Sequence, residues 1–421
     1  MERIVLYSLV AYCFLFGIFS RELGSFPYGI LIEGIIIVEF IVVAITASKI
    51  HWQNVNNEFF YLFLFWFVIS VLEVVNPGAS TMGWLVEIRS TALYPLLIVC
   101  LGFVVFQTNR DLDIFILMVV ILSFIASLNG IKQVFVGLSS GEQRFLDEGG
   151  AVTHLLWGRL RVFSFYSDAG QFGASQAHIG LMAIVMSFGP FKRWKRLLLF
   201  IGGAIMIYGM LISGTRGALF AIIVGGGTAI VLSKKFKVLL LGGMFAMSML
   251  FILKYTHIGD GNYQVYRLRS ALNPNDPSLN LRLINQRLLA SYMSSRPFGG
   301  GLGVIGANGT RYNQDRFLSK IQPDSYYVKV WAMYGIVGFT IWFCIMMFIF
   351  GKCCGIVWNI QDQALKTKLI ALTAGYAGIL FCSYGNEVIN TMPSSIVVYL
   401  SWVFIYLGPK LENTKESTLL V

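Results

Sequence analysis

Apolar residues fill most of the chain in runs of about twenty positions, and short polar stretches separate the runs. Runs of this length are typical of helices that cross the hydrocarbon core of a bilayer. We therefore predict an all-α integral membrane protein with about twelve transmembrane helices. The predicted spans are 4–19, 28–47, 58–76, 88–106, 113–134, 170–189, 197–212, 216–233, 238–254, 326–350, 369–384 and 393–408.

Residues 255–325 form the one long polar interruption, and we predict a large loop there, before the tenth span, within a single polytopic domain 1–421. Apolar residues recur in this loop at helical spacing, at Leu281, Ile284, Leu288 and Tyr292. Arg282 and Gln286 lie on the opposite face of such a helix. This pattern indicates an amphipathic helix on the membrane or on top of the bundle. A plain packing helix with solvated arginines is the alternative.

Three short basic loops predict the orientation of the chain, at 192–196, 234–237 and 352–368. Cytoplasmic loops carry an excess of lysine and arginine, and all three loops follow even-numbered spans. Both termini are then cytoplasmic, and residues 255–325 face the other side of the membrane. The long loop is not an exception to this rule, because the rule applies to short loops.

Composition agrees with a membrane protein. The chain is 56% hydrophobic and 13% charged, whereas a soluble domain has about 25% charged residues. The six cysteines and four histidines show neither metal-ligand spacing nor a disulfide framework. We expect no metal, no cofactor and no nucleic-acid partner.

Arginine dominates the long loop, which carries seven arginines and one lysine against four aspartates. The planar guanidinium suits bidentate contact with phosphate or carboxylate. An arginine surplus on the outer face therefore indicates an anionic ligand. The residues are Arg267, Arg269, Arg282, Arg287, Arg296, Arg311, Arg316 and Lys320, with Asp260, Asp276, Asp315 and Asp324.

Further polar residues lie on the same predicted face. Ser213 and Thr215 can cap the eighth span, whose first turn favours an anion beside Arg216. Arg216 snorkelling to lipid headgroups is the alternative. Arg159 and Arg161 precede the sixth span, where an outer-leaflet phosphate would lie, and Asp168 reads as the cap of that span rather than as a catalytic group.

Several carboxylates have open assignments. Asp324 begins the tenth span, either as a helix cap or as a general base. Glu387 lies between the last two spans and could hold one of the arginines in position. Glu33 and Glu39 fall inside the second span, where carboxylates need partners. They could pair with Arg89 or other polar groups, and we assign them no role.

These features follow one another in a recognisable order. They are Arg161 before Phe163-Ser164-Phe165 and Asp168, the turn Ser213-Gly214-Thr215-Arg216-Gly217, Arg282, the stretch Arg296-Pro297-Phe298-Gly299-Gly300-Gly301-Leu302-Gly303, and Asp324-Ser325-Tyr326 ahead of Tyr334-Gly335-Ile336-Val337-Gly338. Over about residues 155–345 the chain resembles the O-antigen ligase and O-antigen polymerase superfamily of bacterial membrane glycosyltransferases.

The resemblance implies a GT-C-like helical fold in the bacterial inner membrane, with a large periplasmic loop. It implies transfer of a glycan from undecaprenyl diphosphate to a glycan or lipid-A-core acceptor at the periplasmic face, without a metal. By position, Arg161, Arg216 and Arg282 would bind the diphosphate, and Asp324 would activate the acceptor hydroxyl. We therefore predict two sets of site residues. The catalytic set is Asp324, Arg282 and Glu387, and the substrate-binding set is Arg161, Arg216, Arg159 and Ser213.

One position departs from the family pattern. Ligases usually have histidine where this chain has Asp324, and the departure favours a polymerase of O-antigen, capsule or exopolysaccharide over a ligase. Protein O-glycosylation also stays open, because enzymes of that kind share the superfamily. The alternative function is a polysaccharide or anion transporter of the inner membrane. The prediction that separates the two is spatial, because an enzyme requires Arg161, Arg216, Arg282 and Asp324 to converge in one cavity.

Overall fold

Long helices lie at every predicted span. The computed structural model describes residues 2–24, 26–46, 52–156, 158–234, 236–258, 261, 263–270, 272–273, 275 and 277–419. The long helices are α1 Glu2–Glu22, α2 Ile30–Ile45, α3 Glu58–Leu72, α4 Thr81–Ile88, α5 Tyr94–Val105, α6 Asn109–Phe135, α9 Ala169–Ser187, α10 Arg193–Ile212, α11 Arg216–Leu232, α12 Phe236–Tyr255, α16 Tyr326–Asn359, α17 Gln363–Cys382 and α18 Ser394–Tyr406.

Within the described residues, seven helical segments are long and apolar enough to cross a membrane. They are α1, Glu58–Val75, Thr81–Val105, α6, α10, α16 and α17, and the shorter helices α11 and α18 are also apolar. The protein is therefore an all-α, multi-pass membrane protein. The total of about twelve spans stays a prediction.

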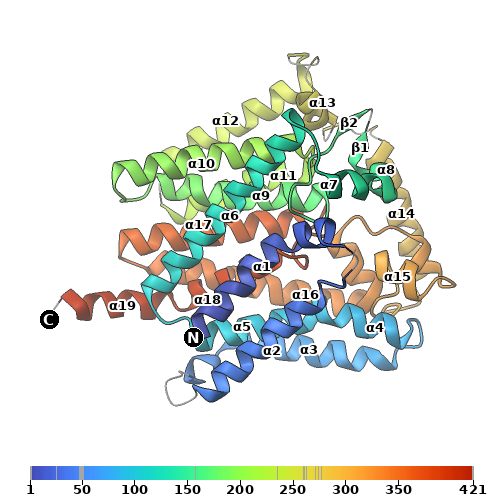
Figure 1. The fold of residues 1–421 in the computed structure, drawn as a ribbon, viewed down its shortest axis with the longest axis horizontal. Coiled ribbons are helices and arrows are strands. Elements are labelled where there is room, and N and C mark those ends of the chain that lie inside the picture. Colours follow the sequence, from blue (N-terminus) through green and yellow to red (C-terminus); the bar gives the residue numbers. More distant parts are fainter. Residues whose placement is uncertain are drawn as a thin grey trace.

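Small residues bring the central helices close together. A Cβ added at Gly225 of α11 would lie 2.5 Å from the Ala374 carbonyl oxygen of α17, and one at Gly203 of α10 would lie 2.7 Å from the Ile184 side chain of α9. Glycine and alanine at such contacts let membrane helices approach backbone to backbone. The helices α9, α10, α11 and α17 pack together in this way in the middle of the bundle (Figure 1).

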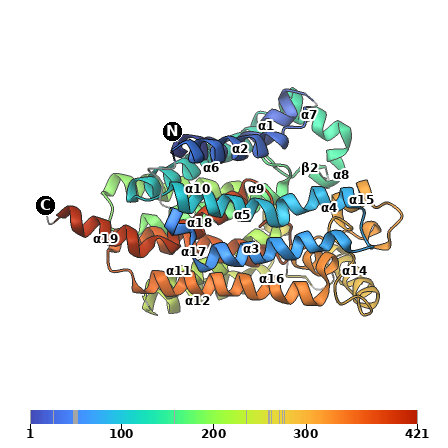
Figure 2. The same ribbon diagram turned by 90° about the horizontal axis from the view of Figure 1, so that it is seen from below.

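Most of the elements of the long loop gather at one end of the bundle, together with the short elements that follow α6. They include α8, α14 and α15, whereas α19 and the C-terminus lie at the other end (Figure 1; Figure 2 gives a second view). The predicted long loop thus contains short helices, although Asp260 and Asp276 lie outside the described residues. The short elements are η2 Trp52–Val55, η3 Glu73–Val75, η4 Arg89–Leu93, α7 Ser140–Phe145, η5 Leu146–Gly150, α8 Ala151–His154, β1 Leu155–Leu156, β2 Arg159–Leu160, α13 Tyr263–Ser270, α14 Pro277–Met293, α15 Gly306–Tyr312, η6 Phe317–Lys320 and α19 Gly408–Leu419. Strands β1 and β2 pair antiparallel.

Helix α16 is kinked at Gly335, where φ is 69° and ψ is −171°. Residues 297–303, which we call the glycine segment, pack against this kink. Gly300 N–H donates to Ala332 O and Gly301 N–H to Met333 O, both at 2.9 Å. A Cβ at Gly335 would lie 2.0 Å from the Pro297 carbonyl oxygen, so only glycine fits there. The kink fixes the glycine segment on the helix that begins beside Asp324.

Candidate functional site

Two arginines line a cavity of about 300 Å³ at the end of the bundle where the short elements gather. Arg216 is the first residue of α11, and Arg282 comes from α14. Most of the remaining lining is apolar, and includes Phe220, Leu283, Leu289, Val328 and Phe381. We call this space the arginine cavity. It combines two cations with apolar walls, which suits an amphipathic anion.

A second cavity of about 340 Å³ shares Arg282 and Gln322 with the first. Three carboxylates line it, from Asp168, Asp324 and Glu387. The other lining residues are mostly small or polar: Gly170, Gln171, Asn386, Val388 and Thr391. We call it the carboxylate cavity. Arg282 lies between the two spaces. Arg216, Arg282 and Asp324 are therefore brought into two adjoining cavities and not into one, and Arg161 lines neither of them.

Asp324 faces Arg282 from the segment that enters α16. Its Oδ2 lies 3.5 Å from Nε of Arg282, and both side chains are about one-third exposed. The helix cap is not Asp324 but Ser325, whose hydroxyl accepts from Val328 N–H. Asp324 itself has φ +47°, a conformation that non-glycine residues rarely adopt. Asp324 therefore does not cap the helix, and it lines the carboxylate cavity instead. The alternative that Asp324 caps this helix was wrong.

Glu387 belongs to a buried network of alternating charges. Its Oε2 lies 3.0 Å from Nζ of Lys329, and Nζ lies 3.0 Å from Oε1 of Glu87. Glu87 also accepts from Asn308 at 2.8 Å and from Thr91 at 3.2 Å. The expectation that Glu387 holds an arginine was wrong, because its ion-pair partner is a lysine. Our sequence reasoning missed both Lys329 and Glu87, since each lies within an apolar predicted span or at its edge and nothing in the pattern pairs them.

The turn before α11 is shaped by side chains that face inward. The Ser213 hydroxyl is fully buried, donates to Met210 O at 2.6 Å and accepts from Thr215 N–H at 3.2 Å. Ser213 therefore shapes the turn and is not among the residues that line either cavity, and its role in substrate binding stays a prediction. Arg267, which we had not singled out, donates to Gly214 O at 3.3 Å. Arg216 donates to the Ser270 hydroxyl at 3.3 Å.

Arg161 and Arg159 stand further from the cavities. Arg161 donates to Ser213 O at 3.4 Å and to Thr153 O at 3.1 Å, so it lies against the turn that leads to Arg216. Neither arginine is among the residues that line the arginine or the carboxylate cavity, and Arg159 is exposed on β2. The structure thus places Arg161 next to the site and Arg159 at the surface beyond it.

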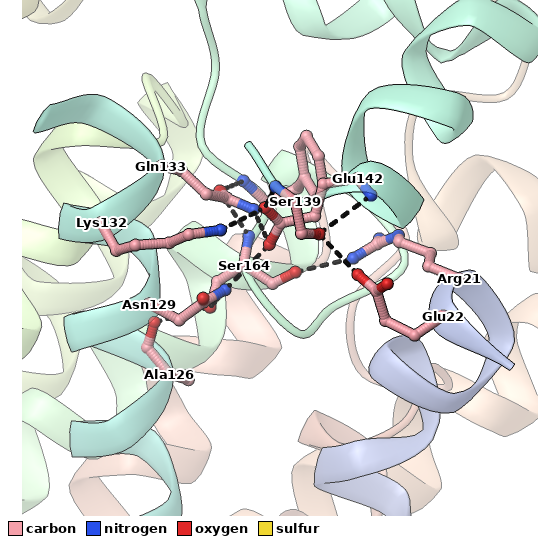
Figure 3. A network of polar contacts seen from close by, with 10 residues as sticks. Arg21, Glu22, Ala126, Asn129, Lys132, Gln133, Ser139, Glu142 and Ser164 are labelled. Carbon is pink, nitrogen blue, oxygen red and sulfur yellow. Dashed lines mark hydrogen bonds and ion pairs between the residues drawn. The ribbon is translucent and has the colours of Figure 1, made fainter. Parts of the chain in front are cut away.

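A polar network anchors the segment that carries these arginines, between α1 and α6 (Figure 3). Arg21 of α1 donates to Ser164 O at 2.6 Å and lies over the rings of Phe145 and Phe163, 4.8 and 4.5 Å from their centroids. The Ser164 hydroxyl donates to Ala126 O of α6 at 2.6 Å. The segment from Arg159 to Asp168 is therefore tied to two long helices.

Glu142 of α7 closes the same network (Figure 3). It accepts from Lys132, from Gln133 and from Ser139 N–H, each at 2.8 Å. Burial acts to raise the pKa of Glu142, but these hydrogen bonds outweigh it and lower the pKa below its ordinary value. The carboxylate is therefore ionised at neutral pH and works as an anchor.

Asp168 was predicted to cap the helix that follows it. It caps α9, because its Oδ1 accepts a hydrogen bond from Gln171 N–H at 2.9 Å. Glu33 pairs with Arg89, as the sequence suggested. Both carboxylate oxygens of Glu39 are buried and have no hydrogen-bond partner among the described residues. We assign Glu39 no role.

Comparison with known proteins bears on the segment that holds most of the site. No curated protein matches the chain. A protein-family model described as O-antigen ligase matches residues 201–343. This range covers α11, α14 and the start of α16, and therefore Arg216, Arg282 and Asp324, while Glu387 lies beyond it. The resemblance seen in the sequence is confirmed. The protein is a multi-pass membrane protein whose residues 201–343 are similar to the family described as O-antigen ligase.

Proposed function

We propose that the protein transfers a glycan from undecaprenyl diphosphate to a hydroxyl of a glycan or lipid-A-core acceptor, at the periplasmic face of the bacterial inner membrane. The observation that carries this proposal is the joining of two unlike cavities at Arg282. One offers arginines and apolar walls, and the other offers carboxylates. A lipid diphosphate that carries a sugar needs both environments next to each other.

The arginine cavity supplies the donor site. Arg216 and Arg282 reach it from two helices and can each form two hydrogen bonds to phosphate oxygens. The first turn of α11 adds backbone N–H groups and a favourable dipole for an anion. The apolar lining suits the first isoprene units. These groups bind the diphosphate before the reaction and stabilise the negative charge that develops on it as it leaves.

The carboxylate cavity supplies the acceptor site. The acceptor oxygen attacks the anomeric carbon, and the bond from that carbon to the diphosphate oxygen breaks with its electron pair going to the diphosphate. The acceptor proton goes to Asp324, which lies beside Arg282 and therefore beside the leaving group. Glu387 accepts a hydrogen bond from the acceptor and is held in place by Lys329. Proton transfer follows formation of the new bond, because a carboxylate is a weak base. No metal takes part in this scheme.

The test is complementation of a strain deleted for the gene. The variants are Arg216→Ala, Arg282→Ala and Asp324→Asn, with Arg287→Ala as the control, because Arg287 is an exposed residue of α14 that lines neither cavity. Membrane abundance and the length profile of the surface glycan are measured for each. We expect the three site variants to lose transfer at normal abundance and the control to retain it.

The profile also separates the finer possibilities. Single repeat units on the lipid-A core in the deletion strain indicate a polymerase, and long chains left on undecaprenyl diphosphate indicate a ligase. An unmodified carrier protein indicates protein O-glycosylation. Full-length glycan from all three site variants would contradict the site and favour the transporter.

A further inference from the structure

A third cavity, of about 780 Å³, lies at the C-terminal end of α14, beyond the part of the helix that lines the arginine cavity. We call it the groove. Its walls are the end of α3 with η3, the turn at residues 76–78, the end of α14 and the glycine segment. The lining residues are Ile69, Leu72, Glu73, Val75, Asn76, Pro77, Gly78, Tyr292, Arg296, Pro297, Phe298, Gly299, Gly300, Val304, Arg316 and Leu318.

Neighbouring residues of the same segments line the groove and the proposed active site. Leu289 of α14 lines the arginine cavity, and Tyr292, one turn later, lines the groove. In the same way Leu318 lines the groove, and Gln322 lines both cavities of the site. The groove therefore opens beside the site and is not part of the space where the reaction takes place.

Contacts between its two walls hold the groove in shape. Asn76 donates to Phe298 O at 3.5 Å, and Arg316 donates to Pro77 O at 3.2 Å. A Cβ at Gly78 would lie 2.3 Å from the Gly300 carbonyl oxygen, so the walls meet at van der Waals distance. The glycine segment is in turn bonded to α16. A groove built in this way is largely preformed, as small-molecule sites usually are.

The side chains in the groove combine flat surfaces with positive charge. Tyr292 stacks on Phe317 with ring centroids 4.5 Å apart, and the Arg296 guanidinium lies over Tyr292 at 3.9 Å. Phe298 is 65% exposed at the rim, although it is a large apolar residue. Phe317 and the Arg296 guanidinium thus cover Tyr292, and the exposed Phe298 ring is the planar surface that can pack against the apolar face of a sugar ring. Arg296 and Arg316 provide forked donors for carboxylate or phosphate.

Glu73 adds a hydrogen-bond acceptor on the opposite wall. Its Oε2 accepts from Asn76 Nδ2 at 2.9 Å. The groove thus holds two guanidinium groups, from Arg296 and Arg316, against the single carboxyl group of Glu73. Apolar residues such as Ile69, Leu72 and Val304 form much of the remaining lining. Apolar walls, an aromatic ring, one carboxyl group and two guanidinium groups together fit the apolar faces and hydroxyl groups of a sugar that also carries an acid group.

We propose that the groove is a second saccharide site, which binds an acidic glycan that carries carboxylate or phosphate groups. It holds the glycan chain at a distance from the reacting end, while the arginine and carboxylate cavities carry out the transfer. The role in holding the chain rests on the proposed transferase function, whereas saccharide binding itself does not.

Binding to the purified full chain in lipid nanodiscs tests the groove without using catalysis. The probes are an acidic tetrasaccharide of alternating glucuronic acid and N-acetylglucosamine, the neutral tetramer of N-acetylglucosamine, and inorganic phosphate. Saturation-transfer NMR and titration calorimetry measure binding. The variants are Arg296→Gln with Arg316→Gln, the single variant Phe298→Ala, and Arg287→Gln as an exposed arginine control outside the groove. Thermal unfolding confirms that each variant is folded.

We expect the acidic probe to bind, to lose affinity at least tenfold in the double arginine variant and several-fold in Phe298→Ala, and to bind Arg287→Gln as it binds the original chain. Equal binding by the double variant, or no binding of the acidic probe, overturns the proposal. Equal affinity for the neutral probe overturns the acidic class, and full competition by phosphate alone overturns the saccharide class. Full transfer by the three site variants in the complementation test, together with normal probe binding, would count against the transferase and not against the groove.

Discussion

Lys329 is the residue whose removal should cost the most stability. It is nearly buried on α16 between Glu87 and Glu387. We predict that Lys329→Met destabilises the protein by about 3–5 kcal/mol, because it leaves Glu87 buried beside Glu387 without a counter-charge. Lys352→Met is the control on the same helix, because Lys352 pairs with Glu58 at the surface and such pairs contribute about 1 kcal/mol or less. Thermal unfolding in nanodiscs measures both, and equal melting temperatures would refute the buried network.

His154 gives the anchored segment a pH dependence. Burial lowers its pKa below the ordinary value of 6.5, and its Nε2 accepts from Ala169 N–H at 3.2 Å. Among nearby charges, Arg161 and Arg21 lower the pKa further, while Asp168 raises it. Because the folded state prefers neutral His154, its contribution is complete above pH 6.5 and is lost as pH falls below that value.

The corresponding prediction concerns the difference in melting temperature between pH 7.5 and pH 5.5. We expect this difference to be smaller in His154→Gln than in the original chain, because glutamine can accept the Ala169 hydrogen bond and does not titrate. The Glu142 pKa is lowered, so its contribution is lost only at more acid pH and leaves this window undisturbed. An identical pH difference in both proteins would contradict the role given to His154.

Residue type and position were enough to single out Arg216, Arg282 and Asp324 in the sequence, and the structure places them at two adjoining cavities. Charged side chains beside the ends of apolar runs need a ligand or a partner, and arginine points to phosphate. The same reasoning could not show that the Ser213 hydroxyl is buried in the turn, because the hydroxyl of a turn residue can face inward as readily as outward. It also failed for Lys329 and Glu87, whose pairing depends on contacts between distant helices.

At the scale of elements, the kink in α16 is sensitive to the addition of a single methyl group. We predict that Gly335→Ala destabilises the protein by at least about 1–3 kcal/mol, since alanine is strained at this positive φ and its Cβ would clash with Pro297 O. Gly355→Ala, in the same helix, has no neighbouring atoms within 4 Å of the added Cβ. It should be neutral or stabilising by about 0.5–1 kcal/mol.

Thermal unfolding of the two glycine variants provides the comparison. The same experiment should show that Gly335→Ala also weakens binding of the acidic tetrasaccharide, because the glycine segment that packs on the kink forms one wall of the groove. A Gly335→Ala protein as stable as Gly355→Ala would mean that the glycine segment is not fixed by the kink.

Hydropathy located the long helices well, because the length of an apolar run is set by the bilayer and is readable without tertiary contacts. It did not show the kink, since Gly335 stands in an unbroken apolar run. The amphipathic helix was placed correctly as α14, with Arg282 and Gln286 toward the arginine cavity. Its apolar residues Leu281, Ile284 and Leu288 are exposed, which fits an interfacial position.

At the scale of the whole molecule, the three cavities meet around α14 and the segment that enters α16. The donor lipid, the reacting sugars and the glycan chain would therefore occupy three neighbouring spaces at one end of the bundle. Arg282 lies at the junction of the first two, and the wall formed by Leu289 and Tyr292 separates the third. The proposed reaction requires that the end of the bundle with the three cavities faces the periplasm, where the lipid-linked donor would be located.

Orientation is thus the property on which the whole scheme depends, and it follows from the basic loops alone. In a chain whose six unpaired cysteines are replaced by alanine or serine, Arg287→Cys should react with a membrane-impermeant maleimide from the periplasmic side. Lys195→Cys, on exposed α10, should react only after the inner membrane is opened. Labelling is measured by a mass shift on a gel, and each variant is checked for surface glycan in the deletion strain. The reverse labelling pattern would place the arginine cavity in the cytoplasm, where nucleotide-activated sugars are available, and would remove the reason for a lipid-linked donor.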